Sequence, residues 1–369
     1  MGGSVMSEQL VDRFGRVHRD LRISLTDRCS LRCTYCMPAE GVPWLARSTM
    51  LSTEEIVHVA RVGVSLGITE IRLTGGEPLL RVDIVDVVRR LTALTGPAGS
   101  PEVSLTTNAL RLPGLASDLK DAGLSRVNIS LDTLDRAKFL ELTRRDKLVE
   151  TLAGIAAADA AGLHPVKINA VAMRGVNDDE VVALTRFAVD RGYQMRFIEQ
   201  MPLDAGHTWD RAEMVTQAEI LERLRSAFRL EEVPGRGAAP AELWTVDGGP
   251  ATVGVIASVT APFCGACDRL RLTADGQLRA CLFSQTETNV RDLLRGSSDA
   301  PDAAALGIGP GQALRVGATA PPRPAPAAVD VDTALADAYR RCLAGKKAGH
   351  DIDDPSFLQP DRPMSAIGG

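Results

Sequence analysis

Six of the seven cysteines form two groups of three, and thiols grouped in this way can hold metal. In a reducing compartment such groups indicate metal binding rather than disulfides. Three thiolates can each hold one iron of a four-iron cubane and leave the fourth iron free to bind a small molecule. The groups are Cys29-x3-Cys33-x2-Cys36 and Cys264-x2-Cys267-x13-Cys281, and Cys342 stands apart.

Zinc is the alternative metal for both groups. Zinc knots usually begin with a C-x2-C pair and need a fourth ligand nearby, and the first group has neither. The second group does begin with such a pair, so zinc is a more serious alternative there. We expect Cys342 to be a buried helix residue rather than a ligand.

Two arginines follow the second cysteine group at alternating positions. Arg269 and Arg271 therefore lie on one face of an extended strand. A guanidinium donates two hydrogen bonds at once, which suits phosphate. Most Arg-x-Arg pairs are solvated strand faces, but beside three thiolates we prefer substrate binding.

Composition sets limits on the class of protein. A chain of 369 residues with 45% hydrophobic residues can bury a large core, as one large domain with a smaller one or as two modest domains. The net charge of −5 argues against a general nucleic-acid binder. No apolar run reaches the roughly 20 residues that cross a bilayer, and residues 1–10 lack a basic-then-apolar signal pattern. We therefore expect a cytoplasmic protein that does not contact a membrane.

Strand and helix patterns alternate over the first 200 residues. Strands are predicted at 21–25, 68–74, 103–107, 126–131, 166–172 and 194–199. Helices are predicted between them, among them one that Ser52 and Glu55 begin with a capping box and one that Asn177 caps. This βα repeat indicates a parallel sheet, either doubly wound or an incomplete TIM-like barrel. In both designs the chemistry gathers at the carboxyl ends of the strands.

The pattern changes after residue 201. A helix at 217–228, short strands at 243–246 and 252–259, and a last helix at 333–346 predict a second domain. We divide the chain into domains 1–210 and 211–369. Residues 297–328 are dominated by Ala, Pro and Gly, which predicts a flexible insert.

The first cysteine group resembles the signature of the radical S-adenosylmethionine superfamily, because the aromatic Tyr35 precedes Cys36 in C-x3-C-x-Φ-C. The segment 74–78, Thr-Gly-Gly-Glu-Pro, is a second mark of that superfamily, although alone it would be an ordinary turn. The resemblance implies a 4Fe-4S cluster on this group whose open iron is chelated by S-adenosylmethionine. Reductive cleavage of that cofactor then gives a 5′-deoxyadenosyl radical, which abstracts a substrate hydrogen.

The resemblance also implies contacts with S-adenosylmethionine. Gly76 and Glu77 are expected to hold its methionyl amino group, Ser130 and Tyr35 to line its site, and Met201 to contact the adenine. A lone strand-end serine would otherwise be a solvated or turn-forming group.

The whole layout is similar to the GTP 3′,8-cyclase subfamily, on the segments 21–38, 71–78, 197–201, 263–276 and 364–369. This likeness implies a second 4Fe-4S cluster on Cys264, Cys267 and Cys281 that binds guanine. It assigns GTP contacts to Arg22, Arg72, Thr106, Lys167, Arg269, Leu270 and Arg271. It gives catalytic roles to Arg196 and to Gly368 and Gly369, which thread into the site. Such a set of cations suits a triphosphate of about −4 charge.

The subfamily implies an incomplete (β/α)6 barrel whose open side is covered by a smaller C-terminal domain. Its reaction cyclises GTP to 3′,8-cyclo-7,8-dihydro-GTP, the first step of molybdenum cofactor biosynthesis. The implied partners are an electron donor such as flavodoxin or ferredoxin, cyclic pyranopterin monophosphate synthase downstream, and a second copy in a homodimer. Ala109 departs from the glycine frequent in the subfamily. A radical peptide-modifying maturase and a zinc-stabilised binding module are the alternatives.

Overall fold

The computed structural model describes residues 9–204, 206–296 and 330–368. The predicted insert at 297–328 and Gly369 lie outside these residues. Six parallel strands carry the first half of the chain, each followed by at least one helix, as predicted. They are β1 Asp20–Ser24, β2 Glu70–Thr74, β3 Glu102–Thr107, β4 Arg126–Ser130, β5 Lys167–Ala172 and β6 Gln194–Glu199.

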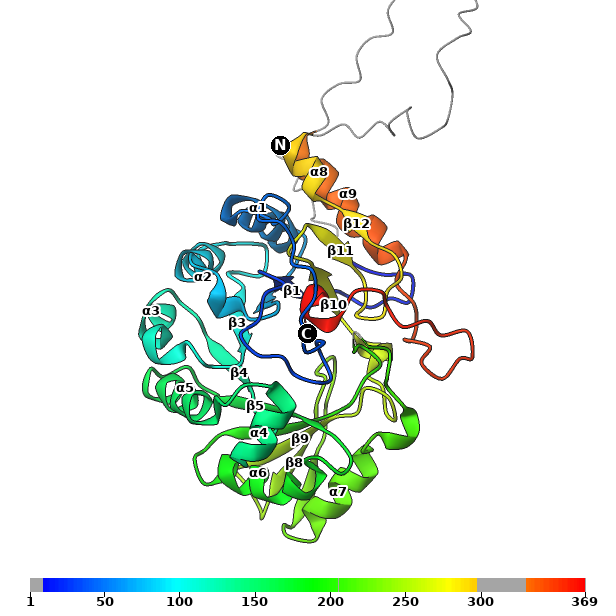
Figure 1. Ribbon diagram of the computed structural model, residues 1–369. Coiled ribbons are helices and arrows are strands. Elements are labelled where there is room, and N and C mark those ends of the chain that lie inside the picture. Colours follow the sequence, from blue (N-terminus) through cyan, green and yellow to red (C-terminus); the bar gives the residue numbers. More distant parts are fainter. Residues whose placement is uncertain (1–8, 205, 297–329, 369) are drawn as a thin grey trace, which may run out of the picture.

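Helices lie outside these strands, as Figure 1 shows. They are α1 Thr53–Ser65, α2 Ile84–Thr92, α3 Ala116–Asp121, α4 Arg136–Thr143, α5 Leu148–Ala160 and α6 Val181–Val189. Short 3-10 turns join them at η1 Pro78–Leu80, η2 Leu112–Gly114 and η3 Asp178–Glu180. The predicted capping box of α1 is present, with Ser52 and Glu55 each bonded to the other's backbone. The predicted α/β architecture of an incomplete barrel is confirmed.

Strands from the second half of the chain extend the same sheet at both edges. Within the described residues the order is β12-β11-β10-β1-β2-β3-β4-β5-β6-β9-β8-β7. β9 lies parallel to β6 and β10 lies parallel to β1, and the outer strands are antiparallel. These strands are β7 Leu230–Val233, β8 Glu242–Val246, β9 Thr252–Ile256, β10 Arg269–Leu272, β11 Gln277–Arg279 and β12 Thr288–Asn289. The division into domains at residue 210 stays a prediction.

The segment 257–268 runs from one edge of the parallel sheet to the other, because it leaves β9 and enters β10. It contains η5 Cys264–Ala266, so two ligands of the second cysteine group lie on this crossing. The other elements of the second half are η4 Arg211–Glu213, α7 Gln217–Arg225, α8 Arg291–Arg295, α9 Val331–Ala344 and α10 Met364–Ile367. Cys342 is buried on α9, as predicted.

The strands turn apolar side chains to one face and polar ones to the other. Alternate residues such as Leu21, Ile23, Ile71 and Leu73 have no exposed surface and join the main hydrophobic core. The residues between them are charged or polar and share the opposite face, where the predicted site residues lie. A core on one face and a charged row on the other indicates a sheet built around a polar ligand.

Two residues noted in the sequence, Asn177 and Ala109, have specific local structures. Asn177 stands at the N-cap position of η3, which leads into α6, but its side chain makes no capping bond. It donates instead to the carbonyls of Asp132 and Val171 and accepts from Met173 N, which ties two strand ends together. Ala109 adopts φ +68°, the left-handed region that favours glycine, so the departure from the subfamily falls on a strained position.

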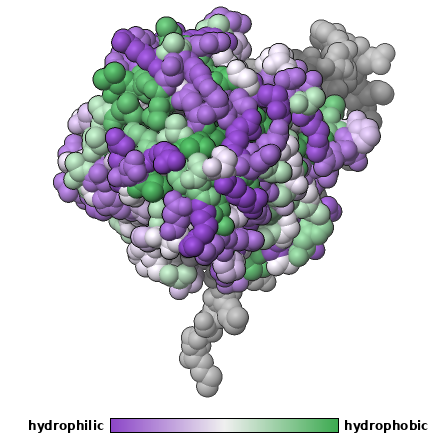
Figure 2. All heavy atoms as spheres, turned by 90° about the horizontal axis from the view of Figure 1, so that it is seen from below, coloured by the Kyte–Doolittle hydropathy of each residue, from purple (hydrophilic) through white to green (hydrophobic). Residues whose placement is uncertain are grey.

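On the face seen in Figure 2, hydrophobic residues lie between hydrophilic ones. Across the parts of the chain that the structure describes, none of the helices has the length and apolar character of a membrane span.

Candidate active site

Three of the predicted GTP-binding arginines are neighbours in the sheet register. Arg22 of β1 is paired with Arg72 of β2 on one side and with Arg271 of β10 on the other. Arg269 shares the face of Arg271, because two residues separate them on one strand. Leu270 lies between these arginines with no exposed surface and belongs to the hydrophobic core. Its side chain therefore points away from the arginine row, so any contact with GTP would be through its backbone.

A buried carboxylate lies within this arginine row and was missed from the sequence. Asp20 Oδ2 is 3.1 Å from Arg269 Nε and 3.9 Å from Arg22 Nε. Burial raises the pKa of Asp20, but Arg22, Arg72, Arg269 and Arg271 outweigh it and the net pKa is lowered. The only sequence signal for the place of Asp20 in the arginine row is its position two residues before Arg22, on the same strand face.

A second group of cations lies on β5 and β6. Burial, followed by the charges of Arg196, Arg126 and Arg72, lowers the pKa of Lys167 to about 7. Burial, followed by Arg72 and Arg126, lowers the pKa of Arg196 to about 9. Both groups are buried near other cations, and buried neighbouring cations are the electrostatic setting of an anion site.

Polar residues between the two groups of cations have atoms free to bind a ligand. Asn128 is paired in register with Thr106 and Lys167, and Asn169 with Ser130 and Arg196. Within the described residues, the buried atoms Arg22 Nε, Asn128 Oδ1 and Asn169 Oδ1 have no hydrogen-bond partner. Buried polar atoms without partners are costly, so these donors and acceptors fit a polar substrate over the sheet.

The first cysteine group follows β1 directly. Burial raises the pKa of Cys29 to about 11, with Glu77 adding to it, and that of Cys36 to about 12, with Cys29 adding to it. Burial and then Asp132 raise the pKa of Cys33 well above its ordinary value. Cys36 N donates to Cys33 O at 3.0 Å, and binding of iron would remove the protons of the three thiols.

The glycines at 75 and 76 allow two loops to meet. A Cβ on Gly76 would lie 2.3 Å from Arg28 O, and one on Gly75 would lie 2.4 Å from Thr26 O. The close approach is thus to the cysteine loop itself, where we expected a ligand. Glu77 is fully buried and accepts from Leu79 N, Thr107 Oγ1 and Asn108 N. Its side chain holds the loop in place, and the amides of Gly76 and Glu77 donate to Thr26 O and Arg28 O at 2.7 Å, so a contact of these two residues with the cofactor amino group would be through their carbonyls.

The other residues predicted to contact S-adenosylmethionine are spread around the first cysteine group. The Tyr35 hydroxyl donates to Asp132 Oδ2 at 2.8 Å, and burial raises the pKa of Asp132 to about 6. Ser130 ends β4, two residues before Asp132. Met201 follows β6 and packs on a small separate core that includes Met214. The structure places Tyr35, Asp132 and Ser130 close together, and Asp132 was not predicted.

The second cysteine group is surrounded by cations. Lys346 Nζ lies 3.7 Å from Cys267 Sγ, and Arg269 NH1 lies 3.9 Å from the same sulfur. Burial raises the pKa of Cys264 to about 11, and Cys281 and Cys267 add to this rise. Burial also opposes ionisation of Cys267, but Lys346 and Arg269 bring its pKa below the ordinary value. Lys346 was missed because a lysine after a helix indicates a solvated end.

The C-terminal segment reaches the first cysteine group and the arginine row. Arg271 NH1 donates to Gly368 O, and the backbone amide of Ser365 donates to the Cys36 thiol. A Cβ on Gly368 would lie 2.4 Å from Thr74 Oγ1, so the tail fits closely at the strand ends. Figure 1 shows α10 in the middle of the ring of elements, beside β1 and β10. The tail therefore lies against the strand ends as far as Gly368, and its role in the active site stays a prediction.

The chemistry of the donor sets fits iron–sulfur clusters. Across the described ranges, no group of three or more His, Cys, Asp or Glu is arranged as ligands of a single metal ion. In a cubane each thiolate binds a different iron, so its ligands need not converge on one point. Each trio supplies three such thiols and no fourth acidic or histidine ligand.

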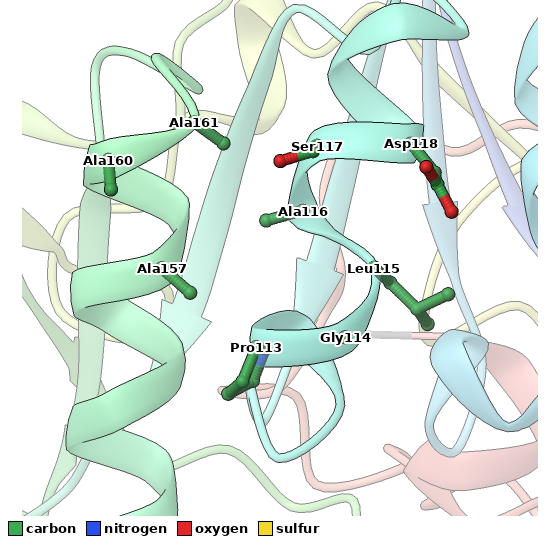
Figure 3. Close-up of a pocket in the computed structure, with 9 residues that line it drawn as sticks. All are labelled: Pro113, Gly114, Leu115, Ala116, Ser117, Asp118, Ala157, Ala160 and Ala161. Atoms are coloured by element: carbon green, nitrogen blue, oxygen red, sulfur yellow. The ribbon is translucent and has the colours of Figure 1, made fainter.

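Two surface hollows lie away from the predicted site residues. One of about 310 Å³ lies between the outer segments η2–α3 and α5, where Ala157, Ala160 and Ala161 face Ala116 and Ser117 (Figure 3). A second of about 420 Å³ lies between β11 and the tail, and includes Arg279 and Arg362. Neither includes a predicted site residue.

Comparison with known proteins agrees with this site. The radical SAM superfamily model matches residues 23–188, and a model described as Molybdenum Cofactor Synthesis C matches residues 193–306. A solved structure of SuiB from Streptococcus suis, bound to the precursor peptide SuiA, has a TM-score of 0.57 at 16% identity, covering 78% of this chain and 67% of that one. This likeness shows a shared fold.

Much closer relatives cover the whole length. A GTP 3′,8-cyclase of Streptomyces coelicolor is 53% identical over 98% of this chain and 96% of its own. GTP 3′,8-cyclase 2 of Mycobacterium tuberculosis is 50% identical over 98% of this chain and 92% of its own. The chain is therefore a radical S-adenosylmethionine enzyme and belongs to the GTP 3′,8-cyclase family.

Proposed function

We propose that this chain cyclises GTP to 3′,8-cyclo-7,8-dihydro-GTP, at the start of molybdenum cofactor biosynthesis. The observation that carries the proposal is the register of Arg271, Arg22 and Arg72 across three adjacent strands, between the two cysteine groups. A row of guanidiniums suits a triphosphate, because each can donate two hydrogen bonds to phosphate oxygens. The names and lengths of the relatives support the same substrate.

The two cysteine groups divide the work. Cys29, Cys33 and Cys36 would hold the cluster that binds S-adenosylmethionine, and Cys264, Cys267 and Cys281 would hold the cluster that binds guanine. When bound, these groups supply the electron and the radical that takes the ribose hydrogen. The backbone of Gly76 and Glu77, with Ser130, Tyr35 and Met201, would position the cofactor.

The protein side chains would bind and orient the substrate. Lys167, Thr106 and the arginine row would hold the phosphates and ribose, while Arg196 stabilises negative charge that develops near the base. Arg196 suits this role because it is buried and, among the residues that the structure describes, only its Nε has a hydrogen-bond partner, Gln194 at 2.9 Å. The tail through Gly368 would exclude water and hold Arg271 in place.

The partners of the reaction follow from its chemistry. A low-potential donor such as flavodoxin or ferredoxin would reduce the first cluster, and cyclic pyranopterin monophosphate synthase would take the product. We also propose a homodimer and a cytoplasmic location. Size-exclusion chromatography with light scattering tests the homodimer.

An anaerobic assay of the full chain with dithionite, S-adenosylmethionine and GTP tests the function. We expect about eight irons per chain and 5′-deoxyadenosine only when GTP is present. Cys29→Ala should abolish this product, and Cys342→Ala, outside both groups, should leave it unchanged. Formation of 5′-deoxyadenosine with a peptide in place of GTP would favour a maturase and contradict the proposal.

A further inference from the structure

The two cysteine groups lie in different electrostatic surroundings. Near the first group the buried carboxyl groups of Glu77 and Asp132 act on Cys29 and Cys33, and Arg32, which donates to Cys29 O at 2.7 Å, partly offsets them. Near the second group the cations Lys346 and Arg269 lie within 3.9 Å of a single sulfur. Reduction adds negative charge to a cluster, so anions nearby lower its reduction potential and cations raise it.

Lys346 is the unusual member of this arrangement. It follows α9 and is 3% exposed, although lysine is rarely buried without a role or a partner. Its Nζ donates to Arg269 O at 2.7 Å and to Cys267 Sγ at 3.7 Å. Low dielectric around a buried ammonium makes its effect on a nearby sulfur larger than that of a surface charge.

The surroundings of Lys346 hold it in position. Arg16 donates to Cys264 O at 2.6 Å and to Lys347 O at 2.7 Å, which links the N-terminal segment to the chain on both sides of the site. Asp12 binds Arg16 at 2.6 Å, so the carboxylate nearest to this network is already paired.

We propose that Lys346 is a positioning residue that tunes the second cluster, its ammonium raising the reduction potential of that cluster above the potential of the first. The proposal rests on the proposed function in one respect, that Cys264, Cys267 and Cys281 hold a 4Fe-4S cluster. A higher potential means that the second cluster accepts an electron more readily than the first, so it would already be reduced when the first cluster receives the electron needed for cofactor cleavage.

Potentiometric titration of the full chain, followed by electron paramagnetic resonance, tests this. Lys346→Met should shift the wave of the second cluster to lower potential by about a tenfold change in its reduction equilibrium, about 59 mV for one electron. Lys346→Arg, which keeps the charge, should retain most of the potential. The full-length variant Cys29→Ala/Cys33→Ala/Cys36→Ala identifies which wave belongs to the second cluster.

Lys347→Met is the matched control, because Lys347 is adjacent, exposed and paired with Asp351. It should leave both waves unchanged. If Lys346→Met loses iron, Lys346→Gln, which can still donate to Arg269 O, gives the same test. Eight irons with no shift, or an equal shift of both waves, would overturn the inference and leave the proposed function intact. Only four irons in the wild-type chain would instead contradict the proposed function and the inference with it.

Discussion

The Arg271 guanidinium donates a hydrogen bond to the Gly368 carbonyl, so a residue of the arginine row is held by the end of the chain. The tail is fixed farther out by Arg362, whose NH1 and NH2 lie 3.1 and 2.9 Å from the two oxygens of Asp275. Arg362 Nε is also 2.7 Å from Glu287. This fork of ion pairs determines where α10 lies.

Arg362→Ala should therefore release the tail and impair catalysis. A bidentate pair of this kind contributes about 2 kcal/mol, so we expect about a tenfold or greater loss of GTP-dependent 5′-deoxyadenosine formation. Amide hydrogen exchange of residues 363–368 should speed up, and the iron content should stay that of the wild-type chain.

Lys147→Ala, which removes an exposed ion pair on the outer surface, is the control for this change. It should alter neither activity nor exchange of the tail. A fully active Arg362→Ala chain with rapid exchange would show that the docked tail is not needed.

Asp20→Asn should destabilise the ligand-free chain. Removing the carboxylate leaves four buried or half-buried arginines without their shared partner, at a cost of about 3–5 kcal/mol in the free energy of unfolding. GTP should restore part of this stability, because its phosphates replace the lost negative charge. Anaerobic thermal unfolding with and without GTP measures both effects. Asp121→Asn, at the exposed end of α3, should show neither, and an equal loss in both variants would contradict the account.

Gly76→Ala should disturb the first cluster and spare the second. The added Cβ would lie 2.3 Å from Arg28 O, so the loop carrying Cys29 must shift. We expect iron to fall from about eight to about four per chain, with loss of activity. Gly114→Ala is the matched control, since nothing lies within 4 Å of a Cβ there. Full iron content in Gly76→Ala would show that the loops tolerate separation.

The affinity for GTP should fall as the pH rises above about 7. The pKa of Lys167 is depressed to about 7, so the ammonium is present below that pH and is lost as the pH rises through it. A polyanion binds the charged form, so Kd should rise by up to about tenfold per pH unit above 7. Calorimetry without S-adenosylmethionine measures it between pH 6.5 and 9. Lys167→Arg should flatten the profile, and identical slopes would rule out this group.

The depressed pKa of Lys167 also makes the free energy of unfolding depend on pH, and the pKa of lysine in the unfolded chain determines the sign of that dependence. The ordinary pKa of lysine, about 10.4, applies there, so between pH 7 and 10 the unfolded chain binds more protons. The ligand-free protein should therefore gain stability as the pH rises through this interval.

Local patterns were sufficient to predict the barrel strands. The predicted strand at 194–199 coincides with β6, and those at 103–107 and 126–131 agree within one residue, because apolar alternation follows from which side faces the core. The pairing of β10 with β1 joins residues about 250 positions apart, and no local pattern encodes it. The proximity of Arg271 to Arg22 came only from family resemblance.

Residues that act through tertiary contacts could not be predicted from the sequence. Lys346 follows a helix and has the sequence signal of a solvated lysine, and its burial depends on the cysteine crossing 257–268. Asp132 was not predicted, since its bond to Tyr35 spans 97 positions. The cysteines, by contrast, were evident because their spacing within short loops already determines their chemistry.

The central claim is that the radical takes hydrogen from the ribose of GTP. GTP deuterated at C3′, incubated anaerobically with reduced protein and S-adenosylmethionine, tests this directly by mass spectrometry of the 5′-deoxyadenosine formed. We expect one deuterium in the 5′-deoxyadenosine and its absence from the cyclised nucleotide. Unlabelled 5′-deoxyadenosine, with deuterium retained in the nucleotide, would contradict the account.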